Sequence, residues 1–389
     1  MMRSFSREKG IFPREFFVFY KYLEFLVLNT LIKEYFFSFI INQEFFSMKI
    51  KLLSIILAFC LIFGSISLFA ACDGEKSDGG LSIVVTIFPE YDWVKQIIGE
   101  DSTAKITVLM DSGVDLHNYQ PTAQDMVTIS DCDLFIHVGG HSDEWVEGVF
   151  AQIGSESIEV INLMTVLGDA VKQEEIIDGM EHVHDENCDH EDEEHHEDAE
   201  HHEDEDHAHV LENDEHVWLS LKNARAACEA ICDKLCKIDA ENAQTYRQNT
   251  DAYCEKLSAL DAEYRSVISA AEQKTLLFGD RFPFRYLVDD YGIEYFAAFS
   301  GCSAESEASF ETVAFLAGKI DELGLKSVIK IEGSDGRIAE TIINTSNSAD
   351  AQILTLDSMQ TTTSADAKNG TTYLSIMESN LEVLKKALQ

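Results

Sequence analysis

"LSIVVTIFP", residues 81–89, is an apolar run rich in β-branched residues that ends at a proline. Such a run predicts a buried strand, because β-branched side chains pack well on a pleated surface and proline cannot continue a central strand. Outward from it, residues 91–99 and 123–132 read as helices, and residues 104–110 and 133–140 read as further strands. Strands that alternate with helices predict a parallel, doubly wound sheet.

The second half of the chain repeats this alternation after a long helical region. Residues 217–237 read as a helix, and residues 239–272 form a longer helical stretch that contains neither proline nor glycine. We therefore predict an α/β fold of two doubly wound lobes joined by a single long helix. The first lobe covers residues 81–222, the helices including the linking helix cover 223–273, and the second lobe covers 274–389. Ligands of open α/β sheets bind beyond the carboxyl ends of the strands, which points to the cleft between the lobes.

The chain is strongly acidic, with 70 Asp and Glu against 29 Lys and Arg in 389 residues and a formal net charge of −41. This balance argues against electrostatic binding to nucleic acid or to an anionic membrane surface, and it suits a cationic partner such as a metal ion. The charge is uneven, since no Lys or Arg lies between Lys172 and Lys222.

The N-terminal part of the chain is predicted to be addressing sequence. Residues 48–72, "MKIKLLSIILAFCLIFGSISLFAAC", have a basic start, an apolar core and small residues before a cysteine, which is the layout of a bacterial lipoprotein signal. Cys72 is then the lipidation site and residues 73–80 are a tether; a plain transmembrane anchor is the alternative. Both place the body outside the cytoplasmic membrane. Residues 1–47 show no clean apolar span and are interpreted as an over-extended reading frame upstream of Met48.

Residues 173–213 are predicted to be a disordered loop of the first lobe. Nine His and fifteen acidic residues fall within 181–209, where like charges repel and apolar groups are few. One interpretation is a solvated loop, and the other is weak capture of several metal ions close to a tighter site.

The nine cysteines do not predict a disulfide framework. Cys228, Cys232 and Cys236 recur every fourth residue, so they share one helix face, where disulfide geometry is rare. We interpret them as small buried apolar side chains, with a thiol metal site on that face as the alternative. The remaining cysteines of the exported part show no pairing: Cys132, Cys188, Cys254 and Cys302.

Five candidate metal ligands stand where a strand meets a loop or a loop meets a helix: His117, His141, His216, Asp280 and Asp357. Imidazole and carboxylate together suit Zn²⁺ or Mn²⁺ better than Ca²⁺. Each has a plainer interpretation, because His141 could be a surface residue, Asp280 could pair with a neighbouring arginine, and Asp357 could cap a helix.

Four segments of the exported part resemble those of the zinc and manganese solute-binding proteins of bacterial ABC transporters, also called the adhesin-lipoprotein family. They are "GVDLHNYQPT" around His117, "EHVWLS" around His216, "RYLVDDYGI" in the second lobe and "LTLDSM" around Asp357. The resemblance implies two α/β lobes on a rigid linking helix, with the metal in the cleft. It also implies that His117, His216 and Asp357 are ligands.

The resemblance leaves one ligand open. The family places a His or Glu five residues before the second-lobe Tyr286, and this chain has Arg281 there, whose guanidinium cation cannot bind a metal. Asp280 could substitute after a small shift, or His141 could enter from the first lobe. The second choice is favoured because imidazole fits a zinc site better.

The sequence therefore predicts an extracytoplasmic, lipid-anchored, monomeric receptor that captures Zn²⁺ and delivers it to an ABC permease with its ATPase subunit. A manganese receptor of the same fold is the alternative, favoured by two His with two carboxylates. A secreted zinc hydrolase is a rival of another class, but no His-Glu-x-x-His motif occurs and no general base stands out, so the chain is not expected to be an enzyme. A surface adhesin is a further, compatible role.

Overall fold

The computed structural model describes residues 80–100, 102–113, 116–154, 157–180, 212–302, 307–348 and 350–389. All of them belong to one structural unit, Gly79–Gln389. Cys72, the signal segment 48–72, the residues before it and most of the His/acid stretch lie outside the described residues.

The first lobe contains a four-stranded parallel sheet with the order β2-β1-β3-β4. Its strands are β1 (Ser82–Val85), β2 (Lys105–Val108), β3 (Leu134–His137) and β4 (Glu159–Asn162). Its helices are α2 (Phe88–Ile98), α3 (Ala123–Ser130), α4 (Trp145–Ile153) and α5 (Leu163–Leu167). The run at 81–89 is strand only as far as Val85. Pro89 lies in the first turn of α2, where backbone N–H groups have no partner within the helix, so the missing N–H of proline costs no hydrogen bond.

The second lobe has the same construction, with the strand order β6-β5-β7-β8 and parallel pairing throughout. Its strands are β5 (Thr275–Phe282), β6 (Glu294–Ser300), β7 (Ser327–Ile331) and β8 (Gln352–Leu356). Its helices are α8 (Arg285–Tyr291), α9 (Phe310–Leu323) and α10 (Arg337–Thr345), while α11 (Ser364–Lys368) follows β8 in the chain but contacts α2 of the first lobe. The predicted fold class, two doubly wound α/β lobes, is therefore confirmed.

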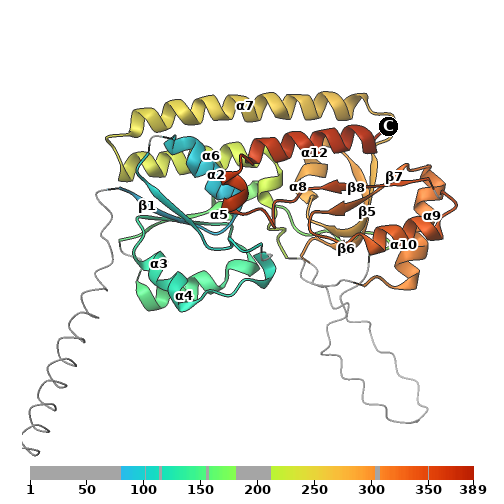
Figure 1. The fold of residues 1–389 in the computed structure, drawn as a ribbon, viewed down its shortest axis with the longest axis horizontal. Coiled ribbons are helices and arrows are strands. Elements are labelled where there is room, and N and C mark those ends of the chain that lie inside the picture. The colour runs from blue at the N-terminus through green and yellow to red at the C-terminus, as the bar shows by residue number, and fades with distance from the viewer. Residues whose placement is uncertain are drawn as a thin grey trace, which may run out of the picture. The chain divides into compact units, whose positions relative to one another are not determined.

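Three long helices run along the two sheets in Figure 1: α6 (Leu221–Ile238), α7 (Ala243–Ala270) and α12 (Tyr373–Ala387). The linking helix α7 contacts α2 of the first lobe as well as α8 and α12 of the second. Helix α12 belongs to the second half of the chain but also contacts α2, so both α7 and α12 connect the lobes. Within the described ranges, no helix combines the length and the apolar character needed to cross a membrane.

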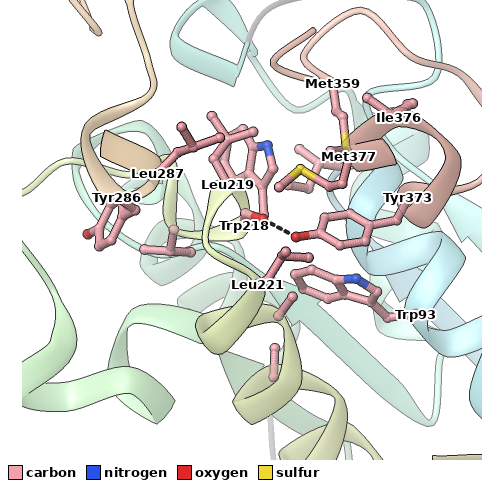
Figure 2. Packing of buried hydrophobic residues seen from close by; sticks show 14 of the residues in the cluster. Trp93, Trp218, Leu219, Leu221, Tyr286, Leu287, Met359, Tyr373, Ile376 and Met377 are labelled. Carbon is pink, nitrogen blue, oxygen red and sulfur yellow. Dashed lines mark hydrogen bonds between the residues drawn. The ribbon is translucent and has the colours of Figure 1, made fainter. Parts of the chain in front are cut away.

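One hydrophobic core continues from the first lobe into the second (Figure 2). The ring of Trp93 in α2 meets the ring of Tyr373 in α12 edge to face, with centroids 5.3 Å apart. The hydroxyl of Tyr373 donates to the carbonyl of Trp218, 2.6 Å away, in the short helical turn η5 (Val217–Leu219). The segment that carries His216 is therefore fixed in the core between the lobes.

The segment 173–213, predicted to be a disordered loop, has defined contacts at both of its ends. An isolated antiparallel bridge joins Gln173 to Asn213, Met180 is buried, and the amide of Asp214 donates to the carbonyl of Lys172 over 2.8 Å. These hydrogen bonds and this burial give residues 173–180 and 212–213 an ordered place beside His216. The weak-capture interpretation concerns residues 181–209, which lie outside the described residues.

Candidate metal centre

Three side chains of types that can bind a metal come together from three distant segments of the chain. His117 lies in the turn η2 (Leu116–Asn118) after β2, His216 immediately precedes η5, and Cys302 follows β6. One nitrogen from each imidazole and the sulfur of Cys302 all lie within 4.8 Å of one another. We refer to these residues as the imidazole–thiol cluster; it is the only group of this kind among the residues that the structure describes.

His216 is fully buried and held from several directions. Its backbone amide and its Nδ1 both face Oδ1 of Asp214, at 2.8 and 3.1 Å. Trp218, in the turn that follows, donates through its indole N–H to the carbonyl of Ser358 over 2.8 Å. Tyr286 of α8 donates to the carbonyl of Asp214 over 2.7 Å. Hydrogen bonds within its own segment, and from that segment to the second lobe, thus set the position of the His216 ring.

His117 is held by a different part of the first lobe. Its Nδ1 lies 2.8 Å from Oγ of Ser142 and 3.4 Å from Oε2 of Glu215. Glu215 in turn accepts a hydrogen bond from the amide of Ser142 over 2.8 Å. Burial acts to raise the pKa of Glu215, but the hydrogen bonds from His117 and Ser142 outweigh it and leave that pKa below its ordinary value. Glu215 is therefore an ionised partner for the His117 ring.

The two imidazoles present their Nε2 atoms to each other at 3.4 Å. Each ring has its Nδ1 beside a carboxylate, an arrangement that favours a proton on Nδ1 and suits Nε2 to binding a metal ion. Two nitrogens bound tetrahedrally to Zn²⁺ at about 2.0–2.1 Å are about 3.4 Å apart, which is the separation observed.

Cys302 brings a donor from the second lobe to this pair. Its backbone amide donates to Oε1 of Glu174 over 2.9 Å. Gly301 packs under the His216 ring, because a Cβ built there would lie 3.2 Å from Cε1 of His216 and 2.8 Å from the carbonyl oxygen of Phe282. Burial, followed by the charges of Glu174 and Asp214, raises the pKa of the Cys302 thiol well above its ordinary value, so the sulfur carries a proton until a cation replaces it.

The other three predicted ligands are not members of this cluster. His141 begins the turn η3 (His141–Asp143), and its side chain is 66% exposed and paired with Glu144 over 2.9 Å. Asp280 lies within β5 and accepts hydrogen bonds from the amides of Arg281 and Ile331. His141 is therefore a surface histidine, as in its plainer interpretation, whereas the Asp280 carboxylate serves backbone amides and its plainer interpretation was a pair with an arginine side chain.

Asp357 follows β8 and lies next to Ser358, the residue that accepts the Trp218 hydrogen bond. Its backbone amide donates to the side chain of Asn380, and its carboxylate accepts from the amide of Met359. Burial, with a smaller contribution from the charge of Glu332, raises the pKa of Asp357 to about 6. A cation bound to this half-buried carboxylate would favour its ionised form, which burial disfavours.

Cys302 was not among the five residues predicted from the sequence to be metal ligands. The available signal was its place directly after a predicted strand of the second lobe, which is the rule that selected His117 and the Asp357 loop. Its neighbours "FSGCSAES" contain no other metal-binding side chain within two positions, and no helical spacing links it to a partner. The proximity to His216 arises from tertiary structure alone.

Comparisons with known proteins place the chain among zinc-binding relatives. The chain is 31% identical over 86% of its length to the "Zinc-binding lipoprotein AdcA" of Streptococcus pneumoniae serotype 4, and it spans 61% of that relative's length. It is 27% identical to the "High-affinity zinc uptake system protein ZnuA" of Bacillus subtilis, over 82% of this chain and 94% of the relative. The zinc-bound ZnuA-like domain of Streptococcus pneumoniae AdcA superposes with a TM-score of 0.59 and 26% identity, over 80% of this chain and 99% of that domain.

A sequence model of one family covers both lobes. The model described as "ZnuA: Zinc-uptake complex component A periplasmic" matches residues 83–387, which include both sheets, the linking helix and all members of the imidazole–thiol cluster. This protein therefore belongs to the ZnuA family of zinc-uptake components.

Proposed function

We propose that this protein is an extracytoplasmic receptor that captures Zn²⁺ between its two lobes and delivers it to an ABC permease. The observation that carries the proposal is the pair of facing imidazoles, His117 and His216, whose Nε2 separation of 3.4 Å fits a tetrahedral zinc ion. The names of the relatives, a zinc-binding lipoprotein and a zinc uptake protein, support the same ion.

The proposed ligand set contains His117, His216 and Asp357, together with one donor from the end of β6. Asp357 is included because its loop is bound to the His216 turn through Trp218 and because it occupies the family's late Asp position. His141 and Asp280 are left out of the set, since the first is paired on the surface and the second serves backbone amides. Holding and releasing an ion requires no catalytic base, so the proposed role is not enzymatic.

The proposed location is the outer face of the cytoplasmic membrane, with lipid on Cys72 as the anchor. The signal-like segment 48–72 supports this, as does the description of the relatives as lipoproteins. One lipidated cysteine tethers the chain while both lobes remain free to meet the permease and its ATPase-driven cycle.

Equilibrium competition among Zn²⁺, Mn²⁺ and Ni²⁺ on the purified chain tests the proposal, with the bound metal measured after dialysis. We expect one tight zinc site, and we expect His216→Ala to weaken it by about a hundredfold or more, because a structural zinc ion gains about 10–16 kcal/mol from roughly four ligands. His141→Ala is the matched control and should leave this site intact. A His216→Ala protein that binds zinc as tightly as the wild type would refute the proposal.

A further inference from the structure

A donor at the end of strand β6 can take the place of the ligand that the resemblance assigns to strand β5. Arg281 stands in β5 where the resemblance places a His or Glu, and it pairs in register with Phe299 of β6. Three residues after Phe299, just beyond the end of β6, Cys302 brings a sulfur close to His117 and His216. Adjacent parallel strands end at the same edge of a sheet, so a donor at the end of β6 can reach a site that a neighbouring β5 donor would otherwise serve.

Two contacts fix where the sulfur lies. The Cys302 amide is bonded to Glu174, and the amide of Glu174 donates to the carbonyl of Glu212, four residues before His216. On the other side, Gly301 lies against the His216 imidazole so closely that a methyl group would not fit without movement. The backbone on both sides of the Cys302 side chain is thus bound to the segment that carries His216.

We propose that Cys302 is a thiolate ligand of the bound ion, and that it makes this receptor selective for thiophilic ions, Zn²⁺ and Cd²⁺, over Mn²⁺. The inference rests on the proposed function and names the chemistry of its ion. On binding, the S–H bond breaks, the sulfur forms a bond to the ion and the proton passes to solvent, so no oxidant or reductant takes part. The resulting set contains two imidazole nitrogens, one sulfur and an oxygen from Asp357.

The selectivity follows from ligand softness. Thiolates bind Zn²⁺ and other soft or borderline ions strongly, whereas Mn²⁺ prefers carboxylate, carbonyl and water oxygens. Zinc accepts Cys and His together in tetrahedral sites, with sulfur at about 2.3 Å and nitrogen at about 2.0–2.1 Å. Replacing a carboxylate ligand by a thiolate therefore moves the preference away from manganese, the alternative ion that the sequence left open.

Cadmium binding to the full chain tests this ligand directly, because a sulfur–cadmium bond has a charge-transfer absorption in the ultraviolet that imidazole and carboxylate ligands lack. All variants carry Cys188→Ser, so that the His/acid stretch contributes no thiol. We expect one equivalent of Cd²⁺ to produce the band, Cys302→Ser to abolish it, and Cys254→Ser, a free cysteine outside the cluster, to preserve it. Persistence of the band in Cys302→Ser would overturn the proposal.

Affinities supply the second readout. Cys302→Ser should lower zinc affinity by at least tenfold and leave manganese affinity unchanged or higher, so the zinc-to-manganese ratio falls. Cys302→His, which offers imidazole instead, should bind zinc tightly without the cadmium band and guards against a serine variant that fails to fold. If Cys302→Ser binds zinc like the wild type while His216→Ala does not, the thiolate ligand is excluded and the receptor function stands. If neither variant changes zinc binding, the proposed site itself fails.

Discussion

At the scale of single residues, the proposed metal centre depends on two neighbouring carboxylates that face two imidazoles. Asp214 faces Nδ1 of His216, and Glu215 with Ser142 faces Nδ1 of His117. Three consecutive residues, Asp214, Glu215 and His216, thus provide one ligand and the orienting groups of two. Such outer carboxylates fix the tautomer and the ring plane and increase the basicity of the ligand.

Asp214→Asn should lower zinc affinity by about 10–100-fold, the usual effect of losing an outer partner of a metal-bound histidine. The amide can still accept a hydrogen bond from the His216 ring, but it lacks the charge that strengthens this bond. Competition with a chelator of known affinity measures the change. Asp233→Asn, at an exposed carboxylate paired with Arg247, is the control, and equal affinities in the two variants would contradict the role of Asp214.

Glu90 gives the first lobe a pH dependence of its own. It is completely buried; its Oε2 accepts hydrogen bonds from Thr86 and Ile87, and its Oε1 has no hydrogen-bond partner among the described residues. Burial first, and the charge of Asp143 as well, raises the pKa of Glu90 well above its ordinary value of 4.5. The native state therefore keeps a proton that the unfolded chain loses above about pH 4.5.

The free energy of unfolding should accordingly decrease as the pH rises from 5 towards 8, by at most about 1.4 kcal/mol per pH unit from this group. Glu90→Gln should flatten that slope, because glutamine has no proton to lose. Urea unfolding of the metal-free protein at several pH values measures the slope, with Glu241→Gln at an exposed position as the control. An unchanged slope in Glu90→Gln would assign the pH dependence to other buried acids such as Asp92.

At the scale of elements, periodicity predicted most of the architecture. The strands at 104–110 and 133–140 and the helix at 123–132 all occur close to the predicted bounds. The helix predicted from Val217 instead begins as the turn η5 and restarts at Leu221, because the Ser220 side chain accepts from the amide of Asn223 and caps a new helix. Strand β4, "EVIN", was missed since four residues with a polar end give too little pattern.

The sequence could indicate a candidate ligand only where a local motif surrounds it. His117 and His216 stand out because their motifs are local, whereas Cys302 reaches them through the pairing of β5 with β6. That pairing contains an irregularity between Phe278 and Arg281, which shifts the register of the strand ends. A displacement of this kind has no signature in the sequence, because it is decided by packing rather than by residue spacing.

The turn after β6 provides a prediction at this scale. Gly301→Ala places a methyl group 2.8 Å from the carbonyl oxygen of Phe282 and against the buried His216 ring, so the turn must move away. We expect a loss of about 1–3 kcal/mol in the free energy of unfolding, typical of overpacking, and zinc affinity about tenfold lower. Chemical unfolding and metal competition measure the two effects.

Gly318→Ala is a matched control for that turn. Gly318 lies in helix α9, and a Cβ there meets no atom within 4 Å. Alanine should stabilise this helix by up to about 1 kcal/mol and leave zinc binding alone. A Gly301→Ala protein that behaves like Gly318→Ala would show that the turn does not depend on a missing side chain.

At the scale of the whole described unit, the two lobes share one hydrophobic core. Trp93 of the first lobe and Tyr373 of α12 are in contact there, and Tyr373 bonds to the carbonyl of Trp218. We therefore expect a single cooperative unfolding transition in urea, with coincident curves from tryptophan fluorescence and far-ultraviolet circular dichroism. Tyr373→Phe should lower the free energy of unfolding by about 1 kcal/mol, because one hydrogen bond is lost. The urea midpoint should therefore fall, and the transition should remain single. Two separated midpoints in the wild type would contradict a shared core.

The distances along the chain between His117, His216 and Cys302 give the proposed ion a mechanical role. A zinc ion held by all three is a reversible staple, since it closes two long loops of backbone and removes their freedom from the unfolded chain. If the two ends of the metal-loaded protein were pulled apart, the whole stretch from residue 117 to residue 302 would stay hidden from the applied force until the coordination bonds failed. Removal of the ion would let that stretch extend, so the force at which it extends would report how strongly the ion is bound.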